Sequence, residues 1–167
     1  MNILPIKIYG NAVLREKAAP VAEITDELLA LIGSMRDSLY YHQGIGLAAN
    51  QVGVARRLFL VDEGKGLRVF INPRILESNG EAVSEEGCLS LPEIFVDVNR
   101  SPSLLLEYLD EKGETRRLEA EGLLARVIQH ECDHLEGVLI SDRAGFLASR
   151  MIKGKLKRLR KRVRESL

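Results

Sequence analysis

The sequence contains no apolar run long enough to cross a membrane, and it contains only two cysteines. A membrane-spanning helix needs about 20 consecutive apolar residues, so we expect no transmembrane segment. Residues 1–10 also lack the basic stretch and following apolar stretch that mark a secretory signal peptide. With Cys88 and Cys132 as the only thiols, a disulfide framework is not expected, and each thiol is a candidate metal ligand, nucleophile or core residue. These absences favour a cytoplasmic protein.

The chain has no repeat and no low-complexity stretch, but its charge is unevenly distributed. Its 167 residues are 46% hydrophobic and 29% charged, which is typical of an ordinary globular protein, so we expect one domain over residues 1–167. The formal net charge is zero, yet residues 147–167 hold nine Lys or Arg against one Glu and carry +8, which leaves −8 on the remainder. Two interpretations of this basic end stay open: it contacts an acidic surface such as nucleic acid, or it is a solvated helix face.

Helical periodicity predicts three helices. Thr25 is a suitable N-cap for a helix over about 26–41, which ends at a glycine-rich loop, residues 42–51. A second apolar stripe with helical period predicts a helix over about 121–135. The basic segment 147–167 has an apolar face and is therefore expected to form an amphipathic helix. The residues of that face are Ile152, Leu156, Leu159 and Val163.

The middle of the chain, residues 57–118, is rich in short β-prone runs separated by turn residues. The strongest hairpin signal joins 103–109 to 115–118 through a turn in which Gly113 can adopt a positive φ. Such short connections favour antiparallel pairing, so strands and helices together predict an α+β fold. The other predicted strands are 58–61, 67–71 and 95–98.

Residues 130–134 read His-Glu-Cys-Asp-His. About 40° around a helix axis separates the two imidazoles, so His130 and His134 can bind one metal ion. Glu131 lies about 100° from His130, close enough to reach a water at the metal without being a ligand, whereas Cys132 faces away and is expected to pack in the core. The alternative is a pair of ordinary polar side chains, but both histidines follow the apolar stripe, where burial demands a partner.

A catalytic metal site needs a third protein ligand and one open position. The metzincin pattern fails because its last histidine would fall on Ile140, and a thermolysin-like site fails because no suitable glutamate follows on a later helix. The third ligand should lie upstream, where Cys88 sits in a turn-prone segment, although a cysteine taken alone is more often an inert core residue. Two alternatives stay open: a zinc peptidase, or a ribosome- or RNA-binding module whose metal is structural.

Three separate stretches together resemble the peptide deformylase family, in the family's order and spacing. The resemblance covers about residues 4–143 and extends to Leu14-Arg15 through Pro20-Val21. It implies antiparallel sheets packed around a central helix with the HExxH motif, followed by the amphipathic basic helix at the C-terminus. It also implies a hydrolase that removes the N-terminal formyl group from formyl-methionine of new polypeptides and releases formate. The stretches are Gly44-Ile45-Gly46-Leu47-Ala48-Ala49-Asn50-Gln51, Glu86-Gly87-Cys88-Leu89-Ser90 and Gln129-His130-Glu131-Cys132-Asp133-His134.

The resemblance assigns the metal ligands and the general base. Cys88, His130 and His134 would hold Fe²⁺, which Zn²⁺, Ni²⁺ or Co²⁺ can replace; the ligand types alone suit zinc equally well. Glu131 would take a proton from a metal-activated water as the water attacks the formyl carbon. It would then deliver the proton to the leaving amine.

The resemblance also assigns residues to the oxyanion and to the substrate. The side-chain amide of Gln51 and the backbone N–H of Leu89 would stabilise the oxyanion, the negative charge that develops on the formyl oxygen. Glycines in the first stretch would let the backbone approach an extended peptide and bind it like an added strand, although a plain tight turn would also explain them. The expected substrate-binding residues are Gly44, Ile45, Gly46 and Gly87.

The sequence does not fix the roles of several residues near the proposed site. Asp133 and Gln129 are candidates for the groups that bind the second nitrogen of each imidazole. Glu93 and Ile94 stand where many relatives have a glycine, which leaves the substrate-side loop and its selectivity open. His42 is assigned no role.

The resemblance implies partners and a location as well. We expect N-formylmethionyl nascent peptides as substrates, and the basic C-terminal helix suggests docking on ribosomal RNA. A monomer in a bacterial-type cytoplasm is expected, with an organelle as the open alternative.

Overall fold

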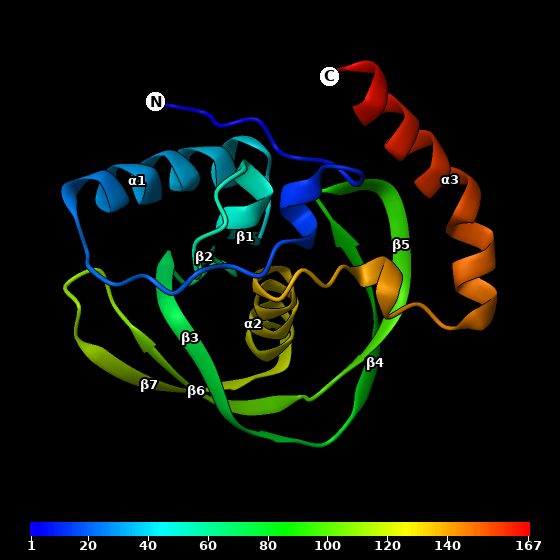
Figure 1. Ribbon diagram of the computed structural model, residues 1–167. Helices are drawn as coiled ribbons and strands as arrows, with labels where there is room; N and C mark the ends of the chain where they lie inside the picture. Colours follow the sequence, from blue (N-terminus) through cyan, green and yellow to red (C-terminus); the bar gives the residue numbers. More distant parts are fainter.

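Seven strands and three α-helices make up the structure, a computed structural model that describes residues 1–167 (Figure 1). The helices are α1 (Asp26–Tyr41), α2 (Gly122–Leu135) and α3 (Phe146–Glu165), with short 3-10 helices η1 (Ala12–Arg15), η2 (Ala49–Val52) and η3 (Ile140–Asp142). The strands are β1 (Gly46–Ala48), β2 (Leu58–Val61), β3 (Arg68–Asn79), β4 (Ala82–Cys88), β5 (Leu91–Arg100), β6 (Ser103–Leu109) and β7 (Thr115–Glu121). They form a five-stranded sheet in the order β1-β2-β3-β6-β7 and a two-stranded sheet, β4-β5. All pairs are antiparallel, so the predicted α+β class is confirmed.

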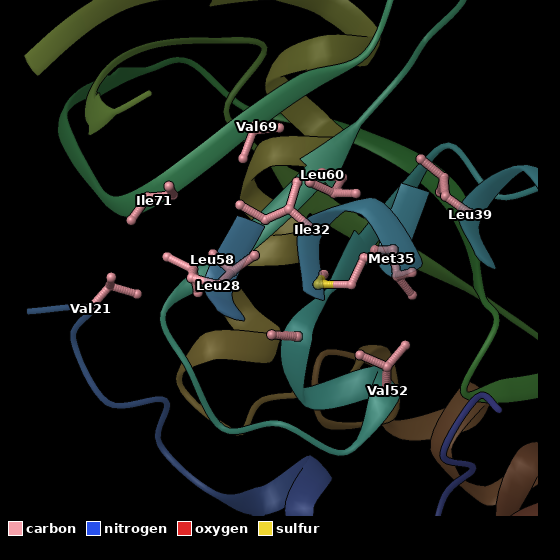
Figure 2. Packing of buried hydrophobic residues seen from close by; sticks show 12 residues of the cluster. Val21, Leu28, Ile32, Met35, Leu39, Val52, Leu58, Leu60, Val69 and Ile71 are labelled. Carbon is pink, nitrogen blue, oxygen red and sulfur yellow. The ribbon is translucent and has the colours of Figure 1, made fainter. Parts of the chain in front are cut away.

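Helix α1 begins where the sequence predicts, because Thr25 caps it. The Thr25 hydroxyl accepts a hydrogen bond from the backbone N–H of Leu28 at 3.1 Å. Asp26 and Glu27 occupy the first turn, where negative charge favours the helix dipole. The buried face of α1 packs against the five-stranded sheet and forms a hydrophobic cluster with it (Figure 2). The labelled members are Val21, Leu28, Ile32, Met35, Leu39, Val52, Leu58, Leu60, Val69 and Ile71.

Strands β6 and β7 form the predicted hairpin, with Leu109 opposite Thr115. Gly113 in the turn has φ +79°, and the Asp110 side chain accepts hydrogen bonds from backbone N–H groups of the turn. Strand β7 continues beyond its expected end at residue 118, and α2 starts directly after it at Gly122. The hairpin therefore leads the chain straight into the helix with the two histidines.

Strand β4 was not predicted, and Cys88 was expected in a turn. Cys88 is instead the last residue of β4, and the turn begins at Leu89. The first part of β4 is exposed along its length, so it lacks the alternation of apolar and polar residues that identifies a half-buried strand. Pairing with β5, whose residues alternate between buried and exposed, is what forms this strand.

Helix α2 lies near the middle of the molecule (Figure 1) and contacts both sheets. Ala125, Ile128 and Leu135 on its buried side pack with Phe59 and Phe70 of the five-stranded sheet. On the other side its arginine at position 126 donates hydrogen bonds to the backbone carbonyls of residues 82 and 98 in β4 and β5. The helix is thus fixed between the sheets.

Helix α3 occupies residues 146–165, close to the predicted 147–167. Its apolar residues Ile152 and Leu159 are buried against Ile94 and Val96 of β5, while its basic residues are exposed. None of the three α-helices combines the length and apolar character that crossing a bilayer requires.

Candidate metal centre

Three possible metal-binding atoms, supplied by strand β4 and helix α2, lie close together. The Sγ atom of Cys88 comes from the end of β4, and the imidazoles of His130 and His134 come from successive turns of α2. The three donor atoms lie within 4.8 Å of one another, and Nε2 of His134 is 3.3 Å from both Sγ of Cys88 and Nε2 of His130. Two nitrogen ligands of one tetrahedral ion would lie about 3.4 Å apart. The spacing fits a single metal ion.

The ring of His130 is oriented by Glu86 on β4. Its Nδ1 donates to Oε1 of Glu86 at 2.9 Å, which leaves Nε2 facing Cys88 and His134. Only 6% of the Glu86 side chain is exposed. Burial alone would raise the pKa of Glu86, but the hydrogen bonds from His130 and Arg100 lower it to about 2. The group behind this imidazole is therefore a carboxylate.

Asp133 and Gln129, the two candidates for this position, bind other groups. The Asp133 carboxylate accepts hydrogen bonds from Arg100 and Arg143, and the Gln129 amide binds the backbone of Ser101 in both directions. Neither forms a hydrogen bond with an imidazole, so the expectation that they bind the second nitrogen of the ligands was wrong.

The spacing of Glu86 and Cys88 in the sequence is itself a signal for the position of Glu86. Residues at positions i and i+2 of a strand point to the same face. Glu86 stands two residues before Cys88, so recognising β4 as a strand would have placed this carboxylate beside the metal site.

The two imidazoles differ in their affinity for a proton. Burial lowers the pKa of His130, but hydrogen bonds with Cys88 and Glu86 outweigh it, so this pKa lies well above its ordinary value. Burial, the charge of His130 and the charge of Arg100 all push the pKa of His134 well below its ordinary value. A neutral His134 presents a lone pair, which is the form in which imidazole binds a metal.

Glu131 lies beside the donor atoms with an unsatisfied carboxylate oxygen. Its side chain is buried, its Oε2 has no hydrogen-bond partner in the chain, and burial raises its pKa to about 7. Gly46 lies against this carboxylate, because an added Cβ there would collide with Glu131 and with Val127. A buried polar atom is costly without a partner, which favours a partner supplied from the adjacent cavity.

Gln51 and Leu89 bring hydrogen-bond donors to the same place. The Gln51 side chain is fixed because its Oε1 accepts from the backbone N–H of Ala48 at 2.9 Å. Its Nε2 donates to Ser90 Oγ at 3.2 Å and lies 3.6 Å from Sγ of Cys88. Leu89 follows in the turn, and its backbone N–H has no acceptor within the chain. Both donors flank the thiol.

A cavity of about 550 Å³ opens beside the donor atoms. The predicted metal, catalytic and substrate-binding residues all line it except His134, which is buried. Apolar lining comes from residues that the sequence did not single out, including Phe95, Leu123 and Val127. The ring of Phe95 lies over Gly87, where an added Cβ would be only 2.8 Å from it. The predicted residues are thus gathered around one open space.

Two strand edges face this cavity. Strand β1 is the end strand of the five-stranded sheet, and β4 pairs only with β5. Residues 44–46, the last of which begins β1, and residues 85–88 of β4 both line the cavity. An extended chain between them would have backbone groups on either side.

Glu93 and Ile94 do not line the cavity, although their neighbours Pro92 and Phe95 do. Glu93 has φ +62°, a conformation that glycine adopts more readily, and its carbonyl accepts a hydrogen bond from Lys155 of α3 at 2.9 Å. Ile94 is buried in the core beneath α3. Both positions thus lie within β5 and outside the cavity lining.

Comparison with known proteins gives a consistent result. The profile of the polypeptide deformylase family matches residues 3–149. A peptide deformylase from Thermoanaerobacter pseudethanolicus is 46% identical over 144 residues, which cover 86% of this chain and 91% of the relative. The crystal structure of the peptide deformylase from Thermotoga maritima has a TM-score of 0.85 at 45% identity and covers 87% of this chain and 99% of that one. That of the Synechococcus elongatus peptide deformylase in complex with actinonin has a TM-score of 0.87 at 42% identity and covers 91% and 85%.

Proposed function

This chain belongs to the polypeptide deformylase family, whose general function is deformylation of nascent peptides, and we propose that it acts by metal-dependent hydrolysis with Glu131 as the general base. The observation that carries the proposal is the convergence of Cys88, His130 and His134 beside Glu131 at one cavity. We also infer that α2 is the centre of the site, since both sheets deliver residues to it. The products would be formate and a free N-terminal methionine.

The donor set suits a divalent metal. A thiolate and two imidazoles accept Fe²⁺, and Zn²⁺, Ni²⁺ or Co²⁺ would fit the same ligands. When bound, such an ion supplies Lewis acidity that makes water acidic enough to lose a proton near neutral pH, at a pKa of about 7. Cys88, His130 and His134 would hold the ion and would leave a coordination position for water, as catalytic sites with three protein ligands do.

Glu131 is suited to move the proton. Burial raises its pKa to about 7, so at neutral pH its carboxylate can accept a proton from water and later donate it. Its Oε2 has no competing partner in the chain. The same carboxyl would protonate the leaving amine, which otherwise departs as an unstable anion.

Gln51 and Leu89 would stabilise the negative charge that develops on the formyl oxygen. Two N–H donors already oriented toward that oxygen need no rearrangement during the reaction. The Gln51 amide is held by Ala48 and Ser90, so its Nε2 stays beside Cys88.

The peptide would bind as a strand between residues 44–46 and β4. Gly46 permits the close approach of backbone to Glu131, and Gly44 and Gly87 likewise carry no side chain into this space. Ile45 and Val127 supply apolar contacts for the methionine side chain. Main-chain hydrogen bonds would then give affinity largely independent of the following residues.

Anaerobic purification with metal analysis tests the proposal, followed by an assay of iron- or nickel-loaded protein on formyl-Met-Ala-Ser. We expect one metal ion per chain and release of formate. Cleavage of internal peptide bonds without formate would favour a zinc peptidase, and unfolding on chelation with no formate release would favour a structural metal.

A second proposal concerns the exposed face of α3. Its apolar face is buried against β5, so the basic side chains that point outward are free to contact the phosphates of ribosomal RNA. Such docking would place the enzyme in the cytoplasm, or in an organelle with its own ribosomes, close to emerging chains. Truncation would expose β5, so charge reversal is the better test.

The triple substitution of Lys153, Lys157 and Arg164 to Glu is expected to abolish ribosome co-sedimentation at low salt. All three side chains are exposed and lie outside the ion pairs of the structure. Lys65→Glu in an exposed loop is the control. Unchanged co-sedimentation of the triple variant would dispose of this proposal.

A further inference from the structure

A chain of charged side chains connects Glu86 with the segment in front of α3. Arg100, only 4% exposed, donates Nε and Nη2 to Glu86 at 2.9 Å and Nη1 to Asp133 at 2.7 Å. Asp133 also accepts from Arg143, which lies between η3 and α3. The imidazole of His130 is thus linked to Arg143 through three intervening side chains.

The contact between Arg143 and Asp133 uses two donors. Nη2 of Arg143 donates to Oδ1 of Asp133 at 2.7 Å, and Nε donates to Oδ2, the oxygen that also accepts from Arg100. Two-point contacts of this kind fix the plane of the carboxylate. Without Arg143, the carboxylate could turn about its side-chain bond and would hold Arg100 less firmly.

We propose that Arg143 is a positioning residue for the metal ligand His130. By fixing Asp133 it holds Arg100 against Glu86, and Glu86 in turn holds Nδ1 of His130. The inference rests on the proposed metal-dependent function. Loss of an outer partner of a ligand commonly lowers metal affinity about 10–100-fold, and because Arg143 acts at greater remove we expect a loss of about threefold to tenfold.

A different explanation is that Arg143 only tethers the start of α3, and the chain provides a matched control for it. Arg15 forms a two-point contact with Asp142, directly beside Arg143 in sequence. The arginine side chain is 43% exposed in both pairs. Both pairs hold the junction between η3 and α3, but only Arg143 contacts a residue that is bonded to Arg100.

Cobalt binding by Arg143→Ala and Arg15→Ala separates the two explanations. Co²⁺ is titrated into the metal-free full-length chain against a competing chelator, and the thiolate-to-cobalt absorption band reports ligation by Cys88. We expect weaker binding and a shifted cobalt spectrum in Arg143→Ala, with Arg15→Ala matching the parent protein. Equal losses in both variants, or no loss in Arg143→Ala, would overturn the proposal.

Two further variants keep the test decisive if Arg143→Ala folds poorly. Arg143→Lys retains the charge but not the two-point contact, so we expect a smaller loss in the same direction, and parent-like affinity would contradict the proposal. Asp133→Asn breaks the same link from the other side, so combining it with Arg143→Ala should add little, whereas additive losses would mean independent effects. A parent protein without the thiolate band would instead contradict the proposed metal site itself.

Discussion

Nδ1 of His130 lies 2.9 Å from Oε1 of Glu86, across the space between helix α2 and strand β4. This contact ties a ligand residue of the helix to the strand that ends in Cys88, and so helps to set the relation between the elements that supply the donor atoms. Arg100 and Arg126 hold the same carboxylate from two further directions. Glu86 is therefore the point on which the geometry of the site depends.

Glu86→Gln should destabilise the fold strongly. The amide keeps the size of the side chain but removes the charge that compensates buried Arg100 and partly buried Arg126, and breaking a buried ion pair costs about 3–5 kcal/mol. Urea unfolding at pH 7 measures the change. Glu85→Gln, the exposed neighbour, is the control and should stay within about 0.5 kcal/mol of the parent protein. Equal stability of the two variants would contradict the central role of Glu86.

Glu131→Ala should retain the metal and lose nearly all turnover. The carboxylate is not among the three donors, and general acid–base catalysis commonly contributes about 10²–10⁴-fold. Metal content per chain and formate release, measured on the same preparation, check both halves of the prediction. Substantial residual turnover at full metal occupancy would remove Glu131 as the base.

Gly46→Ala should inactivate the enzyme while the protein stays folded. The new Cβ would push against the Glu131 carboxylate and Val127, and misplacing a catalytic group by about 1 Å can lower the rate about 10²-fold. Gly33→Ala in α1 is the matched control, since an added Cβ there meets nothing within 4 Å. It should leave formate release unchanged and stabilise the helix by about 0.5–1 kcal/mol. Comparable activity of the two variants would show that the approach at Gly46 is not tight.

In the native, metal-free protein, iodoacetamide should label Cys88 and spare Cys132. Burial raises the pKa of Cys132 to about 12, which leaves almost no reactive thiolate at neutral pH, whereas Cys88 lines the open cavity. Mass spectrometry should find one label on the native chain and two after unfolding in urea. Rapid labelling of Cys132 in the folded protein would contradict the raised pKa of its thiol.

Arg15→Ala should weaken the protein slightly at neutral pH and less in acid. Burial alone would raise the pKa of Asp142, but hydrogen bonds from Arg15 and the Leu139 N–H lower it. In the unfolded chain the pKa of an aspartate is about 3.9. Because the pKa of Asp142 is lower in the folded protein, its carboxylate stabilises the fold at pH values above about 3.9. This contribution is lost as the pH falls through the pKa of the folded protein. The pair is well exposed, so we expect a difference below about 1 kcal/mol at pH 7. Urea unfolding at pH 7 and pH 3 should show the gap closing, and a wider gap in acid would contradict the assignment.

Much of the fold could be predicted from helix caps, turn residues and helical spacing. Each of these depends on only a few neighbouring residues, so it can be recognised in the sequence. Thr25 caps α1 through a hydrogen bond to Leu28, and Gly113 permits the turn between β6 and β7. His130 and His134 follow from helical spacing alone. Cys88 was different: the lack of a downstream ligand made it a candidate, and the family resemblance then assigned it as the third ligand.

The supporting residues could not be predicted because their partners are distant in the chain. Arg100 reads as an ordinary charged residue at the end of a β-prone run, yet it is buried and contacts Glu86 and Asp133. Which strand returns beside which helix depends on tertiary packing. The β4–β5 pairing that brings Arg100 to Glu86 has no short-range signature, because β4 is mostly exposed.

The donor atoms come from parts of the fold that share no strand pairing. Cys88 belongs to the separate β4–β5 ribbon, whereas both histidines belong to the helix seated on the larger sheet. An ion held by all three would act as a cross-link between these parts, closing a loop of more than forty residues without a covalent bond. Without the ion, the attachment of the ribbon to the helix would rest on side-chain contacts such as those of Glu86 with His130 and of Arg126 with the backbone of β4 and β5.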